Sequence, residues 1–149
     1  EKFKELTGKE IEFVQDNEAF SNRGVLRGLH FQKGEFAQAK LVRVVKGKVL
    51  DVVVDIRPNS KTYGEVFSCI LSSENKKQLF VPRGFAHGYS VLEDHTVFVY
   101  KCDNFYQPKS EGGIIYNDEK LNINWMLSEK EIAISEKDKV LKTFNELEI

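Results

Sequence analysis

The sequence predicts an all-β fold, a β-barrel or sandwich with one short helix at each end. Two observations favour it: short apolar runs follow one another through the middle of the chain, and turn-forming residues separate them. Many short strands at this spacing are typical of sandwiches and barrels. The length of 149 residues is typical of a single domain, so one domain spanning 1–149 is expected.

Each element follows from its local pattern. Residues Glu1–Leu6 are predicted to form the last turns of a helix that ends at Gly8, and Ser135–Leu147 has apolar residues at helical spacing. The polar segment Asp16–Arg23 is predicted to be a loop. Strands are expected at Ile11–Gln15, Val25–Gln32, Gln38–Lys46, Lys48–Arg57, Val66–Leu71, Gln78–Val81, Gly88–Leu92 and Thr96–Lys101, with one more at Ile114–Tyr116.

Charge and cysteine content narrow the functional classes. The 22 basic and 23 acidic side chains give a formal net charge of −1, which argues against a generally basic nucleic-acid binder. An anionic small ligand would need local positive charges. No apolar run approaches the roughly 18 residues of a membrane span. Cys69 and Cys102 lack CxxC spacing and follow no signal peptide, so we expect free thiols and a cytoplasmic location.

Side-chain alternation places two aspartates on an otherwise apolar face. In the predicted strand Lys48–Arg57, Asp51 and Asp55 alternate with valines on one face. If this face lines the interior of a barrel, both carboxylates need polar partners. In the preceding strand, Lys40 shares the face of two valines, while Arg43 lies on the opposite face.

Two of the three histidines lie in distinctive segments. His87 follows a proline and a glycine in Pro-Arg-Gly-Phe-Ala-His, which resembles the second conserved motif of the cupin superfamily. A metal cupin usually has two histidines two positions apart in its first motif, but Gln32 stands two residues after His30. A metal site of His30, His87 and a carboxylate is the less favoured alternative. His95, at a turn, is expected to be a solvated loop residue.

Several segments in a fixed order make the resemblance sharper. They read VLRGLHFQ, AQAKLVRV, GKVLDVVVDIR and QLFVPRGFAHG, followed by Tyr100-Lys101 and Tyr116-Asn117-Asp118. From about Phe13 to Asp138, the chain resembles the dTDP-4-dehydrorhamnose 3,5-epimerase family of metal-free cupin isomerases. The resemblance implies a cupin jelly-roll barrel, no cofactor and no metal. It also implies conversion of dTDP-4-keto-6-deoxy-D-glucose into dTDP-4-keto-L-rhamnose, by moving protons at C3 and C5.

The resemblance assigns four catalytic positions, each with a plainer interpretation beside it. His30 matches the general base and Asp138 the carboxylate that orients it, although Ser135-x-x-Asp138 also fits a helix cap. Tyr100 matches the general acid, and its alternative is a core tyrosine. Lys40 matches the lysine near the ketone oxygen, and its alternative is a lysine whose charge reaches the surface.

Further positions are implied for support and for substrate binding. His87 and Asp51 match a second histidine–aspartate pair. Arg27 matches a diphosphate-binding position, and a guanidinium suits phosphate. Strand alternation puts Arg27 and His30 on opposite faces, so either a bulge at Gly28 redirects one of them or Arg27 acts from the rim. Gln15 and Asn17 match positions near the substrate, with ordinary loop surface as their alternative.

The partner expectations are a dTDP-linked sugar and a second copy of the chain in a homodimer, with no nucleic acid and no membrane. Family members normally begin some thirty residues earlier, with an arm that contributes to the dimer and to the partner's site. A natural protein without that arm would have doubtful activity. The alternatives are a C3-only epimerase, a 3,4-ketoisomerase on a related nucleotide sugar, or an inactive cupin that binds sugar nucleotides.

Overall fold

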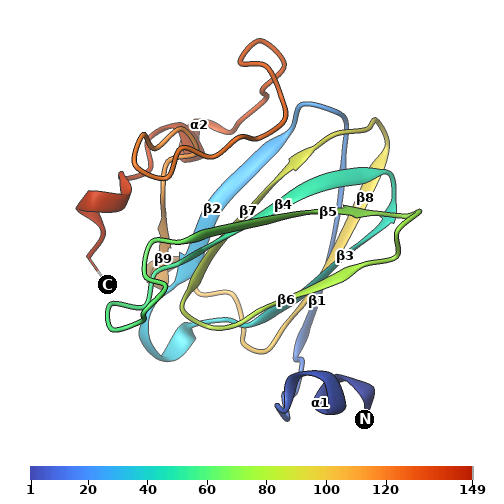
Figure 1. The fold of residues 1–149 in the computed structure, drawn as a ribbon, viewed down its shortest axis with the longest axis vertical. Coiled ribbons are helices and arrows are strands. Elements are labelled where there is room, and N and C mark those ends of the chain that lie inside the picture. The colour runs from blue at the N-terminus through green and yellow to red at the C-terminus, as the bar shows by residue number, and fades with distance from the viewer. Residues whose placement is uncertain (149) are drawn as a thin grey trace.

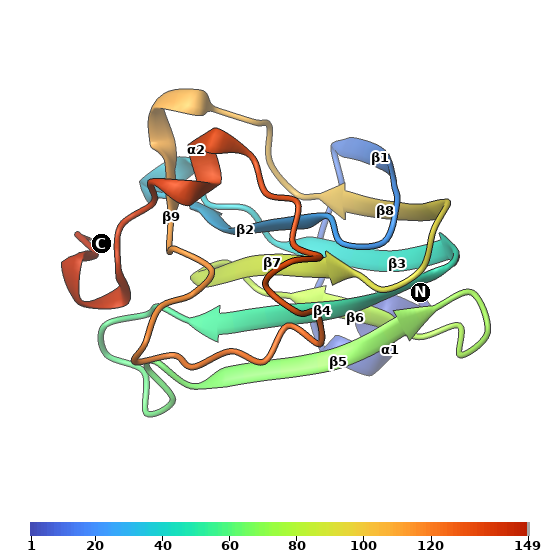
Figure 2. The ribbon, with the colours of Figure 1, turned by 90° about the horizontal axis from the view of Figure 1, so that it is seen from above.

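Two antiparallel β-sheets face each other in the computed structural model, which describes residues 1–148 (Figure 1, Figure 2). The four-stranded sheet has the order β1-β8-β3-β6, and the five-stranded sheet has the order β5-β4-β7-β2-β9. The strands are β1 Gln15–Ser21, β2 Leu26–Gln32, β3 Lys40–Lys46, β4 Lys48–Asp55, β5 Val66–Ser72, β6 Gln78–Val81, β7 Phe85–Val91, β8 Thr96–Cys102 and β9 Glu111–Gly113. The all-β expectation is confirmed.

The helices are short and lie near the two ends of the chain. They are α1 Lys2–Thr7 and α2 Glu136–Lys139, with 3-10 turns at Gly34–Phe36, Pro108–Ser110 and Phe144–Glu146. The glycine predicted to end the first helix does so, because Gly8 adopts a left-handed φ of 67° and donates its backbone N–H to Lys4. No helix among residues 1–148 is long and apolar enough to cross a membrane.

The central strand β4 is buried on both faces, so it separates two apolar clusters. Val49 faces the cluster between the sheets, with Val42, Tyr89 and Phe98. The alternate residues of β4 face a second cluster, which includes Trp125 from the C-terminal segment. The C-terminal segment therefore covers the outer face of the five-stranded sheet. The space between the two sheets holds the cluster that contains Val49.

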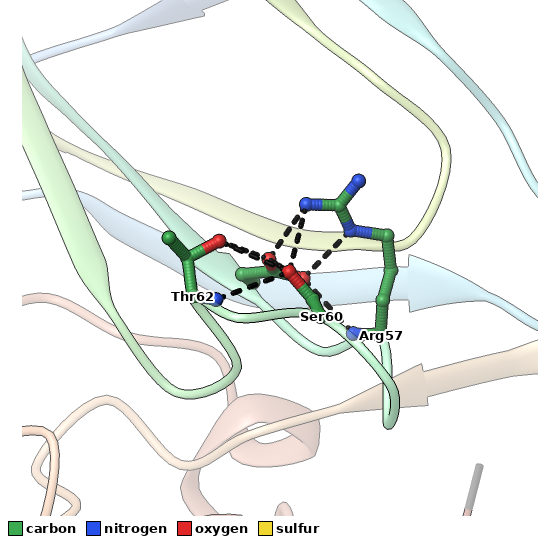
Figure 3. Close-up of polar contacts among 4 residues, drawn as sticks. Arg57, Ser60 and Thr62 are labelled. Carbon is green, nitrogen blue, oxygen red and sulfur yellow. Dashed lines mark hydrogen bonds and ion pairs between the residues drawn. The ribbon is translucent and has the colours of Figure 1, made fainter.

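Both buried aspartates of β4 have the partners that their burial requires. Asp51 is fully buried and bonds to His87. Asp55 accepts hydrogen bonds from the side chains of Arg57, Ser60 and Thr62 at 2.6–2.9 Å, which ties the loop after β4 to the end of that strand (Figure 3). The Arg57 hydrogen bonds hold the pKa of Asp55 far below its ordinary value, against the opposing effect of burial.

Four sequence-based assignments are wrong. The strand expected at Ile11–Gln15 is absent except for Gln15, where β1 begins. The polar segment Asp16–Arg23 is not a loop, because most of it forms β1. The last short strand is Glu111–Gly113 rather than Ile114–Tyr116, where only an isolated bridge from Ile114 is present. Residues Ser135–Leu147 do not form one helix: a single α-turn and a later 3-10 turn are separated by extended chain.

Candidate active site

Two adjoining cavities open between the sheets and share three residues: His30 from β2, Lys40 from β3 and Tyr100 from β8. The first cavity, of about 420 Å³, is also lined by Arg27, His87, Lys137 and Asp138. The second cavity, of about 290 Å³, is also lined by Gln15, Asn17, Tyr106 and Glu111. Eight of the nine side chains predicted for the site therefore line one or both cavities. The ninth, Asp51, is fully buried.

A β-bulge at Gly28 brings Arg27 and His30 to the same cavity. The pairing of β2 with β7 shifts register between these two residues. Gly28 has a φ of +111°, and an added Cβ there would lie 2.7 Å from the Gly88 Cα and from the His87 carbonyl oxygen. Only glycine fits this close crossing of two strands. Of the two arrangements open from alternation, the structure adopts the bulge.

Asp138 both orients His30 and stabilises the start of α2. Its carboxylate lies 2.8 Å from His30 Nε2 and accepts the Gly28 backbone N–H at 3.1 Å, while its own N–H donates to the Ser135 hydroxyl. Burial opposes ionisation of Asp138, but the hydrogen bonds with His30 and Gly28 prevail and lower the pKa of the carboxyl. The expected helix cap is present, and the contact with His30 is compatible with the orienting role, which stays a prediction.

The second histidine–aspartate pair lies deeper. His87 Nε2 lies 2.9 and 3.0 Å from the two carboxylate oxygens of Asp51, and both side chains are buried. The His87 ring stacks against Phe98 with centroids 6.3 Å apart. His87 thus presents one edge to the first cavity and has the other fixed by a carboxylate.

Lys40 and Tyr100 lie side by side on the opposite sheet. The Lys40 ammonium lies 5.8 Å from the centre of the Tyr100 ring. Burial lowers the pKa of Lys40, an effect opposed by the charges of Cys102, Asp51 and Glu111. Burial likewise raises the pKa of Tyr100, so that its hydroxyl keeps its proton at neutral pH. Both side chains line the two cavities, and Tyr100 also packs against the core cluster between the sheets.

The comparisons with known proteins agree on one family. A family model described as dTDP-4-dehydrorhamnose 3,5-epimerase matches residues 1–146. The dTDP-4-dehydrorhamnose 3,5-epimerase of Escherichia coli (strain K12) is 50% identical over 145 residues, which cover 97% of this chain and 78% of that protein. The chain belongs to the dTDP-4-dehydrorhamnose 3,5-epimerase family.

Solved members of this group have the same fold. The dTDP-6-deoxy-D-glucose-3,5-epimerase of Legionella pneumophila, solved in complex with dTDP-4-keto-L-rhamnose, is 47% identical with a TM-score of 0.94, over 99% of this chain and 77% of that one. A 3'-monoepimerase from Streptomyces bikiniensis, solved with dTDP-quinovose, is 32% identical with a TM-score of 0.88, over 95% and 71% of the two chains. The expected family and its cupin-type jelly-roll fold are confirmed.

The alternative of a metal centre finds no support in the geometry. Each cavity histidine is already paired with one carboxylate, Asp138 for His30 and Asp51 for His87. Within residues 1–148, no group of three or more histidine, cysteine or acidic side chains is arranged to hold a metal ion. His95 lies exposed at a turn, as expected.

Three further residues of the site were missed by the sequence analysis. Glu111 accepts hydrogen bonds from the Tyr106 hydroxyl at 2.6 Å and from the Lys137 ammonium at 2.7 Å. This cluster joins the loop after β8, strand β9 and helix α2 at the edge of the cavities. The only sequence signal was the position of Lys137 directly before Asp138.

Proposed function

We propose that this chain converts dTDP-4-keto-6-deoxy-D-glucose into dTDP-4-keto-L-rhamnose by inverting C3 and C5. The expected epimerase activity is confirmed at the level of the family by a match over almost the whole chain and by relatives that are about 50% identical. The observation that supports the mechanism is the placement of His30 and Tyr100 on opposite sheets around shared cavities. Inversion requires a base on one face of the sugar and an acid on the other.

His30 is the base in this proposal. Because the Asp138 carboxylate can only accept a hydrogen bond, His30 Nε2 carries the proton and Nδ1 keeps its lone pair. C3 and C5 both adjoin the C4 ketone, so Nδ1 can take a proton from either carbon while the electron pair moves onto the ketone oxygen. The ketone itself is the electron sink, and no cofactor is required.

Lys40 and Tyr100 complete the reaction. The Lys40 ammonium stabilises the negative charge that develops on the C4 oxygen, and its partly desolvated position strengthens that interaction. Tyr100 then delivers its hydroxyl proton to the carbon from the face opposite His30. Solvent exchange returns a proton to Tyr100 and removes one from His30, which closes the cycle. The His87–Asp51 pair supports the deep wall of the first cavity.

Local positive charge supports binding of the nucleotide diphosphate. Arg27, Lys40 and Lys137 all line the first cavity, although the net charge of the chain is only −1. We assign the diphosphate to Arg27, whose fork of N–H donors matches phosphate oxygens. Gln15 and Asn17 in the second cavity are assigned to the remaining part of the nucleotide. A homodimer and a cytoplasmic location remain part of the proposal.

One experiment separates this function from a C3-only epimerase and from an inactive sugar-nucleotide binder. The protein is incubated with dTDP-4-keto-6-deoxy-D-glucose in heavy water, and the product is analysed for configuration and deuterium. Deuterium and inversion at both C3 and C5 are expected. Inversion at C3 alone would favour the monoepimerase alternative, which the Streptomyces bikiniensis structure makes specific. Binding without any exchange would leave an inactive sugar-nucleotide binder.

A further inference from the structure

The side chain of Gln32 lines the second cavity and holds a neighbouring loop through its amide group. This residue occupies the position, two after His30, where a metal cupin would have its second histidine. Its side chain is buried, and both ends of the amide are bonded. The oxygen accepts the Gln107 backbone N–H at 2.7 Å, and the nitrogen donates to the carbonyls of Phe105 at 3.1 Å and Phe36 at 2.6 Å.

Gln32 therefore bonds to the backbone on both sides of Tyr106, at Phe105 and at Gln107. Two further hydrogen bonds fix Tyr106 itself: its backbone N–H donates to Gln15 Oε1 at 3.3 Å, and its hydroxyl donates to Glu111 at 2.6 Å. The Tyr106 side chain nevertheless remains 53% exposed, at the edge of the second cavity. Polar contacts, and not core packing, hold this aromatic ring in place.

A neighbouring set of amides joins the same loop to the chain before β3. Gln38 donates to the Asn104 carbonyl, and Asn104 donates to the Glu35 carbonyl. The residues between 103 and 110 are thus attached to the rest of the protein at several points, but among residues 1–148 only the Gln32 side chain bonds on both sides of Tyr106. A ring held in one position before the ligand arrives binds more tightly, because less conformational entropy is lost on binding.

We propose that Gln32 is a positioning residue for ligand binding, which fixes the Phe105–Gln107 segment so that Tyr106 forms a preorganised wall of the second cavity. This inference rests on the proposed function, since the ligand is taken to be the dTDP-linked sugar. Gln32 itself does not transfer protons. Its effect on the enzyme passes through Tyr106.

The test uses Gln32→Glu, which keeps the shape of the side chain but directs a carboxylate oxygen at two carbonyl oxygens. Gln32→Met removes all three hydrogen bonds and serves as a second variant. The matched control is Asn75→Asp, because Asn75 is also an amide that bonds on both sides of a turn, to Ser72 and Lys77, and donates to Ile70. Asn75 lies outside both cavities.

Four quantities are measured: Kd for dTDP, KM and kcat for dTDP-4-keto-6-deoxy-D-glucose, and the rate of hydrogen exchange at the Gln107 amide. In Gln32→Glu and Gln32→Met, we expect Kd and KM to rise about tenfold, kcat to change less than about threefold, and Gln107 to exchange faster. Asn75→Asp should leave all four unchanged. In a Tyr106→Ala background, Gln32→Glu should add almost nothing to the loss of affinity, because its effect passes through that ring.

Several outcomes would overturn the inference. Unchanged exchange at Gln107 would mean that Gln32 does not hold the loop. Faster exchange with unchanged Kd and KM would mean that the Gln32 hydrogen bonds stabilise the loop but do not affect ligand binding. Fully additive losses of affinity in the double variant would show that Gln32 acts without Tyr106. If the wild type binds dTDP but turns nothing over, the proposed function fails while the Kd comparison still decides the role of Gln32. If it does not bind dTDP, both fail.

Discussion

The carboxylate of Asp138 lies 2.8 Å from His30 Nε2, although 108 residues separate the two in the chain. Ser135 caps the single turn of α2 that contains Asp138, and Gly28 donates its N–H to the second carboxylate oxygen. The orientation of His30 thus depends on a buried acid that is itself fixed by a helix cap and by the β2 bulge.

Replacing His30 by alanine should abolish turnover and leave the fold intact. The side chain is only partly buried, so little packing is lost, whereas the proposed acceptor of the carbon-bound proton is removed. Loss of a general base costs at least about 10²-fold in rate. The measurement is deuterium uptake at C3 and C5, with circular dichroism as the control for folding. Near-normal turnover would exclude His30 as the base.

Lys40→Met should separate activity from stability. We expect turnover to fall by about 10²–10³-fold, because the charge that stabilises the enolate oxygen is gone. Burial lowers the pKa of Lys40, so its ammonium is less stable in the folded protein than in the unfolded chain. The variant should therefore be at least as stable as the wild type at pH 7, and this gain should shrink as the pH rises above the lowered pKa.

Parallel thermal unfolding and steady-state assays check both parts. A clear loss of Tm with normal turnover would indicate that Lys40 is structural. A fall in both would point to disturbed packing against Tyr100 and would contradict the assigned role.

Asp55→Asn should destabilise the fold in a pH-dependent way. The hydrogen bonds from Arg57, Ser60 and Thr62 favour the ionised carboxylate of Asp55. Replacing this carboxylate by an amide should lower the free energy of unfolding by roughly 2–3 kcal/mol at neutral pH. Because the folded pKa of Asp55 is lowered, this stabilisation is complete above about pH 4 and is lost as the pH falls through the folded pKa.

Urea unfolding of both proteins between pH 7 and pH 3 measures this difference. The gap between wild type and Asp55→Asn should narrow below about pH 4. The exposed pair of Asp16 with Lys101 supplies the control, since Asp16→Asn should change stability by less than about 0.5 kcal/mol. A gap that stays constant with pH would show that the charge of Asp55 contributes nothing.

Most strands were predictable because one or both of their faces are apolar. Strand β1 was missed because its inward residues include Gln15, Asn17 and Ser21, which gives no apolar alternation. The first two of these line the second cavity rather than a core, so polar residues stand where a strand packed on a core would have apolar ones. The short strand β9 was missed because Gly112 and Gly113 lack side chains and carry no hydrophobic pattern.

The apolar spacing in Ser135–Leu147 predicted a helix that the structure does not contain. Val140 is 81% exposed, whereas Phe144 is buried in the core against the five-stranded sheet. The chain reaches that core through a separate 3-10 turn that begins after Thr143. In the site, the segment VLRGLHFQ was enough to predict His30 and its neighbours. The Tyr106–Glu111–Lys137 cluster joins three separate segments, so no contiguous sequence motif predicts it.

Exhaustive chelation should leave activity unchanged. Both cavity histidines bond to a single carboxylate, and Gln32 uses its amide to hold a loop. The assay is turnover after prolonged treatment with EDTA and removal of the chelator, with metal analysis of the same sample. Loss of activity that one divalent metal restores would contradict the metal-free mechanism.

Tyr100→Phe should impair inversion far more than substrate binding. Phenylalanine keeps the ring that packs near Phe98 and Lys40 but removes the proton that Tyr100 would donate. As a core tyrosine, Tyr100 would lose about 1 kcal/mol of stability at most, and turnover would hardly change. As the general acid, its loss should lower turnover by about 10²–10⁴-fold.

The two roles separate further in heavy water. Because His30 and Lys40 remain, the enolate should still form in Tyr100→Phe, and deuterium can return from the face of the base without inversion. In this variant, deuterium uptake should therefore continue while inversion of configuration is largely lost. Both are followed in one sample. If inversion proceeds at the wild-type rate, Tyr100 is not the acid. Tyr106, whose hydroxyl donates to Glu111 at the edge of the second cavity, is then the residue to replace next.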